Sequence, residues 1–378
     1  MTECNRINWT EADVARSAIW HSENKTPAPR RVVIADDTLK ADVAYRLACE
    51  GTALLWHGDF QNARQLLQAL SRRISRPPHK RKQKTEPATP AEIFNLHRQA
   101  QSLRARVLAM LLIPLNQDYT IPLRRAPDIR AACAEAYGAS KGAAVVSLRE
   151  LLGLVGAHEW RLKGVAVPAL GERVHPYYGV FSPVRGEYAD LVANAPLPRG
   201  DTAFDIGTGT GVLAAILARR GMRRVVATDL DPRAVACAGE NIARLGLSAQ
   251  VSVVEADLYP TGRAALVVCN PPWIPARPAA AIEYAIYDPD SRMLRRFLQG
   301  LPDHLEPEGE GWLILSDLAE HLGLRSRQEL LAMIDTAGLK ILGSAEIKPR
   351  HPKSADATDP LHFARAAEVT SLWRLAVA

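Results

Sequence analysis

The segment from Thr202 to Leu213, TAFDIGTGTGVL, constrains the fold more than any other part of the chain. A short apolar run leads into glycines at every second position, and an apolar helical pattern follows. This order predicts a strand, a tight turn and the start of a helix. Such a turn needs glycines because a Cβ atom would penalise its backbone angles and would block the close approach of a ligand. The free N–H groups at the helix start point at the same spot, so the segment predicts a nucleotide-type cofactor site.

The spacing of Gly207, Gly209 and Gly211 narrows the kind of cofactor. A dinucleotide fingerprint needs a third glycine three residues after the second, and Val212 stands in that position. With Asp205 the pattern is DxGxGxG, which resembles motif I of the class I S-adenosylmethionine-dependent methyltransferases. The alternative is an ordinary glycine-rich turn between a strand and a helix. An NAD-dependent oxidoreductase is disfavoured because the third glycine is absent.

Beyond this segment, short apolar runs and helical patterns alternate along the chain. Strands are expected in RVVATDL, VSVVEADL and ALVVC, with helices in GVLAAILARR and PRAVACAGENIARLG. This alternation predicts an α/β fold with a doubly wound, Rossmann-like parallel sheet. The resemblance to the methyltransferases implies seven strands, of which the last is antiparallel.

Acidic residues follow the expected strands. Asp229 ends the second strand, where a carboxylate can accept hydrogen bonds from both ribose hydroxyls. Asp231 is the alternative, but its place in an Asp-Pro helix start better fits an N-cap. The resemblance further implies that Asp257 and Leu258 contact the adenine and that Asp205 supports the methionine end of the cofactor.

The apolar run ALVVC leads into Asn270, Pro271, Pro272 and Trp273. This motif falls at the carboxyl end of a strand beside the expected topological switch point, where open α/β sheets bind ligands. Two successive prolines cannot join a sheet ladder and hold the backbone extended, so they present side chain and carbonyl with little freedom. The alternative is a proline-rich turn with Trp273 in the core, which the preceding motif I and both acids disfavour.

The motif resembles the [DN]-P-P-[YFW] motif of amino-methyltransferases, which holds a planar NH₂ group. The resemblance implies that Asn270 Oδ1 and the Pro271 carbonyl accept the two hydrogens, while Trp273 stacks on the flat acceptor. Catalysis then rests on in-line positioning, and no general base is required. The expected catalytic residues are Asn270, Pro271, Pro272 and Trp273. The expected cofactor-binding residues are Asp205, Gly207, Thr208, Gly209, Gly211, Asp229, Leu230, Asp257, Leu258 and Asn270; no metal site is expected.

The segment before motif I, GVFSPVRGEYADLV, resembles the corresponding segment of the glutamine methyltransferases of release factors and of a ribosomal protein. Pro183, Arg185 and Glu187 match in shifted form, so the resemblance implies a location beside the cofactor and no individual role. One departure is that Ala264 and Ala265 precede the NPPW strand, where relatives usually carry an acid.

We expect two domains, with residues 1–165 forming a mainly helical accessory domain for target recognition and residues 166–378 the catalytic domain. Residues 1–30 are polar and are expected to be loosely held. Short strands are expected near residue 31 and in TALLW, and helices over 90–112, 127–137 and 143–154. A basic linker covers residues 72–90; its part from 72 to 84 holds seven Lys or Arg and no acid. It fits either a patch that binds RNA phosphates or a solvated linker.

Composition narrows the class of protein. The 47% apolar and 23% charged residues are typical of a soluble globular protein, and no apolar run is long enough for a membrane span. The five cysteines lack C-x-x-C spacing, which argues against a zinc site, and we expect Cys237 and Cys269 to be buried thiols. The chain is therefore expected in the cytoplasm, and its oligomeric state is open.

Together these features predict an S-adenosylmethionine-dependent N-methyltransferase. The expected acceptor is a planar amino nitrogen in a component of the translation machinery, either a protein glutamine or an RNA base. The segment before motif I favours glutamine, whereas the basic patch favours RNA. The alternative is a catalytically silent, methyltransferase-like module that binds RNA; the intact motifs argue against it.

Overall fold

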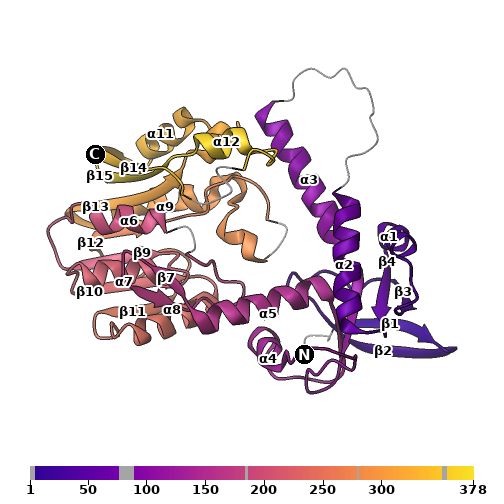
Figure 1. Cartoon of the computed structure of the whole chain (residues 1–378). Coiled ribbons are helices and arrows are strands. Elements are labelled where there is room, and N and C mark those ends of the chain that lie inside the picture. The colour runs from indigo at the N-terminus through magenta and orange to yellow at the C-terminus, as the bar shows by residue number, and fades with distance from the viewer. Residues whose placement is uncertain (1–4, 76–88, 184–185, 279–280, 351–355) are drawn as a thin grey trace. The chain divides into compact units, whose positions relative to one another are not determined.

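A computed structural model describes residues 5–75, 89–183, 186–278, 281–350 and 356–378 (Figure 1). The chain divides into two compact units. The N-terminal unit contains residues 1–87 and 95–159, and the C-terminal unit contains residues 88–94 and 160–378. Most of the predicted basic linker lies outside the described residues, as does Arg185, whereas Arg72 and Arg73 end a helix of the N-terminal unit. No helix within the described ranges combines the length and the apolar character that a membrane span requires.

The N-terminal unit is organised around a six-stranded mixed sheet of order β1-β2-β6-β5-β4-β3. Strands β3, β4 and β5 are parallel, β1 and β2 form an antiparallel pair, and β6 runs antiparallel to β5. The strands are β1 (Arg6–Glu11), β2 (Val14–His21), β3 (Arg31–Ala35), β4 (Thr52–Trp56), β5 (Leu111–Leu115) and β6 (Ala144–Ser147). The helices are α1 (Ala41–Cys49), α2 (Phe60–Ile74), α3 (Pro90–Leu108), α4 (Arg130–Tyr137) and α5 (Leu148–Lys163), of which α3 begins and α5 ends in the C-terminal unit.

This architecture corrects the expected mainly helical domain. Helices α3 and α4 lie close to the expected ranges, whereas β6 occupies the start of the range expected for the last helix and α5 follows it. The helices accompany a sheet of which only β3 and β4 were anticipated. Strands β5 and β6 are short, buried apolar runs at the edges of helical patterns, and periodicity alone cannot separate such a strand from a buried helix. The expected loose start at residues 1–30 instead contains β1 and β2.

The C-terminal unit contains a seven-stranded sheet of order β11-β10-β9-β12-β13-β15-β14. The last strand in the chain, β15, is antiparallel to both of its neighbours, and β9 to β13 are parallel, as predicted. The strands are β9 (Thr202–Ile206), β10 (Arg224–Asp229), β11 (Val251–Glu255), β12 (Ala264–Cys269), β13 (Leu305–Ser316), β14 (Leu339–Ile347) and β15 (Thr370–Val377). A separate antiparallel pair, β7 (Val165–Val167) and β8 (Glu172–Val174), precedes them.

Helices cover both faces of this sheet, which confirms the doubly wound α/β fold (Figure 1). Alternate strand residues enter two separate cores because side chains along a strand point to opposite faces. Ala203 packs with α6 and α7 in one core, whereas Phe204 packs with α9 and α11 in the other. The helices of this unit are α6 (Glu187–Asn194), α7 (Val212–Arg219), α8 (Pro232–Arg244), α9 (Arg292–His304), α10 (Leu318–His321), α11 (Arg327–Thr336) and α12 (His362–Ala367).

Candidate functional site

The glycine-rich turn connects β9 to α7 and has the backbone that the sequence predicted. Gly207, Gly209 and Gly211 have φ angles of 71°, 57° and 84°, a region that side chains with a Cβ rarely adopt. A Cβ on Gly209 would meet no atom within 4 Å, so open space borders the turn there. Gly211 is the N-cap of α7 and provides no side chain to cap the helix. The turn therefore places the start of α7 beside open space, where the positive end of the helix dipole favours an anionic or polar ligand.

Asp205 lies beneath this turn and is 1% exposed. Its Oδ2 accepts hydrogen bonds from Thr208 Oγ1 at 2.6 Å and from the Ala214 N–H at 3.0 Å. Burial raises the pKa of Asp205 to about 6, although these two hydrogen bonds favour the charged form. The structure thus shows Asp205 and Thr208 holding the turn to the first residues of α7.

Asp229 stands at the end of β10, beside the glycine-rich turn. The register pairs Thr228 with Ile206, so the residues after both strands are neighbours. Asp229 Oδ2 accepts a hydrogen bond from the Gly209 N–H at 2.9 Å, and its Oδ1 accepts one from the Asp231 N–H at 3.0 Å. Burial raises the pKa of this carboxyl. A carboxylate has about four acceptor positions, and the Leu230 N–H also donates to this one, so part of its acceptor capacity remains for a ligand such as a ribose.

The residues after Asp229 have different roles. Leu230 is 65% exposed and adds apolar surface at the rim of the site. Asp231 caps α8, since its side chain accepts a hydrogen bond from the Arg233 N–H at 2.9 Å. The interpretation of Asp231 as an N-cap is therefore confirmed.

Asp257 and Leu258 follow β11, the next strand. The Asp257 carboxylate forms two hydrogen bonds with the Arg296 guanidinium, of 2.9 and 3.0 Å, and this partner lowers its pKa. Leu258 has a φ of 79°, which is strained for a residue with a branched side chain. Its carbonyl accepts a hydrogen bond from the Thr228 hydroxyl, which holds the strained residue beside β10. Arg296 lies on α9, and nothing in the sequence had indicated it as a partner of Asp257.

The NPPW motif follows β12, the strand beside β9 at the switch point of the sheet. The register pairs Cys269 with Ile206, so Asn270 and Gly207 come directly after adjacent strands. Asn270 Oδ1 accepts a hydrogen bond from the Trp273 indole N–H at 2.8 Å. Trp273 is half-buried and packs against two apolar clusters, while Pro271 is buried. The motif is therefore a rigid unit in which tryptophan orients asparagine.

Two buried residues that were not predicted from the sequence support the NPPW motif and the neighbouring start of α9. Arg325 is 4% exposed and donates from its guanidinium to the Trp273 carbonyl and to Ser291 Oγ, both at 3.4 Å. The buried Asp288 accepts hydrogen bonds from the Met293 and Leu294 N–H groups and so fixes the start of α9. Arg325 stands before an ordinary helix start in the sequence, which gave no signal of this contact.

The start of α9 also reaches the glycine-rich turn. A Cβ built on Gly207 would lie 3.0 Å from Met293 Cε. The turn after β9, the carboxylates after β10 and β11, and the motif after β12 therefore meet at one edge of the sheet. All the predicted site residues lie along this edge.

Similarity to known proteins agrees with this geometry. Residues 173–332 match the family model described as methyltransferase small domain. A release factor glutamine methyltransferase of Cereibacter sphaeroides is 32% identical over 169 residues, which are 41% of this chain and 58% of that protein. A putative protein N5-glutamine methyltransferase of Methanocaldococcus jannaschii is 27% identical over 49% of this chain and 92% of that protein. A tRNA1(Val) (adenine(37)-N6)-methyltransferase of Shewanella loihica is 29% identical over 35% of this chain and 59% of that protein.

The family match lies in the half of the chain that carries both motifs, and together with the similar proteins it confirms the predicted resemblance. The chain spans between 58% and 92% of the length of these three relatives.

Proposed function

We propose that the C-terminal unit transfers a methyl group from S-adenosylmethionine to a planar amino nitrogen. The observation that carries this proposal is the position of Asn270-Pro271-Pro272-Trp273 after β12, directly beside the glycine-rich turn after β9. In open α/β sheets ligands bind at this switch point, so a cofactor on the turn and an acceptor on the motif would be neighbours.

The chain's own residues fit the cofactor. The glycine-rich turn and the start of α7 would border its polar methionine end, and the open space beside Gly209 would admit the ligand. Asp229 retains acceptor positions for the ribose hydroxyls, and Asp257 with Leu258 borders the adenine end. When bound, S-adenosylmethionine supplies an electrophilic methyl group on a positively charged sulfur.

Asn270, Pro271 and Trp273 would orient the acceptor. Asn270 Oδ1 has two lone pairs, of which the Trp273 indole N–H engages one. The second lone pair, together with the Pro271 carbonyl, can accept both hydrogens of an NH₂ group and turn its nitrogen lone pair towards the methyl group. The Trp273 ring supports the flat acceptor by stacking. Because the rate enhancement comes from position and fixed dipoles, no side chain has to remove a proton before transfer.

The acceptor we propose is a component of the translation machinery, which places the reaction in the cytoplasm. Two kinds of acceptor present the same planar NH₂ group, a glutamine side chain and the exocyclic amine of an RNA base. The names of the similar proteins include both kinds: the release factor enzyme is a glutamine methyltransferase and the tRNA enzyme an adenine methyltransferase. The N-terminal unit would serve in recognition of the target, with the basic residues from 72 to 84 available for RNA.

Two measurements test this proposal. Calorimetric titration with S-adenosylmethionine, S-adenosylhomocysteine and NAD should give binding of the first two and none of NAD. Incubation with methyl-labelled cofactor and lysate from a strain that lacks the protein should then move label into protein or RNA. Binding without any transfer of label would instead support the catalytically silent module.

A further inference from the structure

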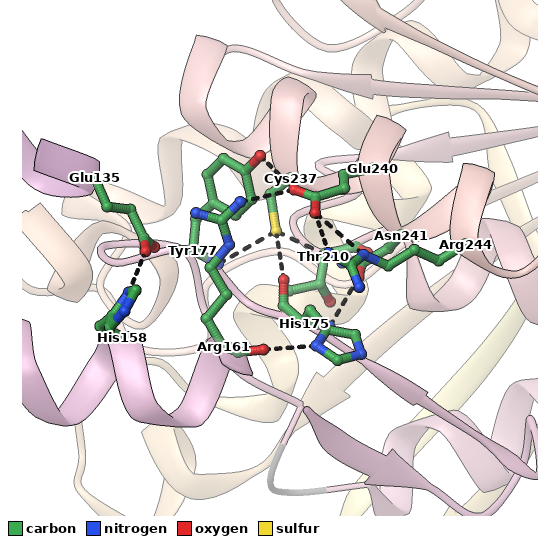
Figure 2. A network of polar contacts seen from close by, with 10 residues as sticks. All are labelled: Glu135, His158, Arg161, His175, Tyr177, Thr210, Cys237, Glu240, Asn241 and Arg244. Carbon is green, nitrogen blue, oxygen red and sulfur yellow. Dashed lines mark hydrogen bonds and ion pairs between the residues drawn. The ribbon is translucent and has the colours of Figure 1, made fainter. Parts of the chain in front are cut away.

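Asn241, in the third turn of α8, is a buried polar side chain that the predicted site does not include. It is 1% exposed, and both ends of its amide are engaged (Figure 2). Nδ2 donates to the Thr210 carbonyl at 3.0 Å, and Oδ1 accepts from the His175 N–H at 2.8 Å. Thr210 stands between Gly209 and Gly211, so this one side chain joins the glycine-rich turn to the segment from residue 175 to 179.

The Asn241 amide satisfies both partners at this place. The Thr210 carbonyl needs a donor, whereas the His175 N–H needs an acceptor; the first contact is buried and the second is partly buried. A carboxylate would direct an oxygen at the Thr210 carbonyl, and an apolar side chain would leave both groups without a partner. Such buried polar groups are costly when they lose a hydrogen bond.

The backbone of α8 also lies directly behind the turn. A Cβ on Gly211 would be 3.4 Å from both Cα and Cβ of Ala238, so the N-cap of α7 packs against α8 without space between them. Asn241 comes three residues after Ala238 on the same side of the helix. The helix thus supports the turn by packing at Gly211 and by a hydrogen bond at Thr210.

A second set of contacts holds the segment from 175 to 179 to α8 independently of Asn241. Glu240 Oε2 accepts hydrogen bonds from the Tyr177 hydroxyl at 2.6 Å and from Arg161 at 2.8 Å, and the Arg161 guanidinium covers the Tyr177 ring (Figure 2). Arg233 donates to the Tyr178 carbonyl at 3.2 Å. The hydrogen bond from Tyr177, with those from Arg244 and Arg161, lowers the pKa of Glu240 to about 2. The Glu240 contacts therefore hold this segment, but none of them touches the turn.

We propose that Asn241 is a positioning residue for the cofactor. Its hydrogen bond to the Thr210 carbonyl fixes the orientation of the peptide unit between Thr210 and Gly211, and with it the shape of the glycine-rich turn that would border the ligand. This inference rests on the proposed function for the identity of the ligand, but not for the effect on the turn. The hydrogen bonds of Glu240 to Tyr177 and Arg161 hold the same segment without contacting the turn. A Glu240 variant is therefore a matched control, on the same helix, for effects that do not pass through the turn.

The test compares Asn241→Asp and Asn241→Ser with Glu240→Gln. Asn241→Asp keeps the acceptor for the His175 N–H but opposes the Thr210 carbonyl, and Asn241→Ser is the second variant in case the first does not fold. Both should bind S-adenosylhomocysteine about tenfold more weakly than the wild type, while the rate at saturating S-adenosylmethionine stays within about twofold. In Glu240→Gln the affinity should stay within about twofold of the wild type.

Amide hydrogen exchange of the ligand-free protein gives a readout that needs no cofactor. The N–H groups of Gly209 and Gly211 donate to Asp229 and to the Thr208 carbonyl, and they should exchange faster in the Asn241 variants than in Glu240→Gln. A folded Asn241 variant with wild-type exchange at the turn and wild-type affinity would overturn the inference. Equal losses of S-adenosylhomocysteine affinity in all three variants would also overturn it, because they would indicate general destabilisation of the protein. If the wild type bound no S-adenosylhomocysteine, the proposed function would fail, and the exchange result alone would decide the role of Asn241.

Discussion

The two units both place asparagine after a buried parallel strand, yet only Asn270 belongs to the site that we propose. In the N-terminal unit, Asn116 follows β5, and its amide donates to Thr120 Oγ1 at 2.9 Å within its own turn. In the C-terminal unit, Asn270 follows β12 and is oriented by Trp273. The comparison teaches that a polar residue at a strand end indicates function only where a candidate cofactor turn adjoins it, as the glycine-rich turn after β9 adjoins Asn270.

The start of α2 in the N-terminal unit also differs from the start of α7 in the C-terminal unit. Asp59 caps α2 by accepting a hydrogen bond from the Gln61 N–H at 2.9 Å, and it is paired with Arg125 at 2.7 Å. The hydrogen bond from Arg125 lowers the pKa of Asp59, whereas burial raises the pKa of Asp229. Helix α7 has Gly211 as its N-cap, and Asp205 accepts a hydrogen bond from the Ala214 N–H in its first turn. An aspartate therefore holds both helix starts, but Asp59 is paired with an arginine, whereas the turn before α7 borders open space at Gly209.

The largest difference between Asn270 and Asn116 should appear in the methyl-transfer rates of their alanine variants. Asn270→Ala removes an acceptor that orients the nitrogen lone pair, so the single-turnover rate of methyl transfer should fall about 10²–10³-fold, or about 2.7–4 kcal/mol. Cofactor affinity should not change, because the proposed partner of Asn270 is the acceptor. Asn116→Ala, the matched control, should retain the wild-type rate. Near-wild-type transfer by Asn270→Ala would rule out the amino-nitrogen mechanism.

Asp205 should make the C-terminal unit sensitive to pH. Its pKa is about 6 in the folded protein against an ordinary value of 3.8, so the folded state holds the proton more tightly than the unfolded state. Stability should therefore fall as pH rises from about 4 to about 6, by up to about 3 kcal/mol, and then level off. Urea unfolding of the wild type and of Asp205→Asn across this range measures the difference. If the free energy of unfolding changed with pH by the same amount in the wild type and in Asp205→Asn, the result would contradict the burial of an ionisable Asp205.

Asp229→Ala should weaken cofactor binding by about 1–3 kcal/mol, since it removes the acceptor proposed for the ribose and a partner of the Gly209 N–H. Asp59→Ala is the control from the other unit. It should lower the thermal stability of the protein and leave cofactor affinity as in the wild type. Calorimetric titration of both variants with S-adenosylhomocysteine decides the matter, and equal affinities in Asp229→Ala and the wild type would refute the ribose assignment.

The smallest effect should come from Trp273→Phe. Phenylalanine keeps an aromatic ring for stacking but loses the indole N–H that holds Asn270. The transfer rate should fall by about two- to twelvefold, which corresponds to the free energy of about 0.5–1.5 kcal/mol for one hydrogen bond. Trp273→Ala, which also removes the ring, should lose more. Identical rates in Trp273→Phe and the wild type would show that the indole N–H does not orient Asn270.

The fold of the C-terminal unit was predictable because its signals are local. The glycines with positive φ, the proline pair and the regular alternation of strands and helices each follow from a few consecutive residues. The sheet of the N-terminal unit was missed because β5 and β6 are short apolar runs beside helices. The contacts of Arg296, Arg325 and Asn241 were also missed, because each joins segments far apart in the sequence.

The most direct test of the central claim is to identify the atom that receives the methyl group. The wild-type protein is incubated with methyl-labelled S-adenosylmethionine and lysate from a strain that lacks it, and the labelled product is digested and analysed by mass spectrometry. The geometry around Asn270 predicts that the label resides on a nitrogen, either the amide of a glutamine or the exocyclic amine of a base. Label on carbon, oxygen or sulfur, or on a ring nitrogen without an NH₂ group, would contradict this account.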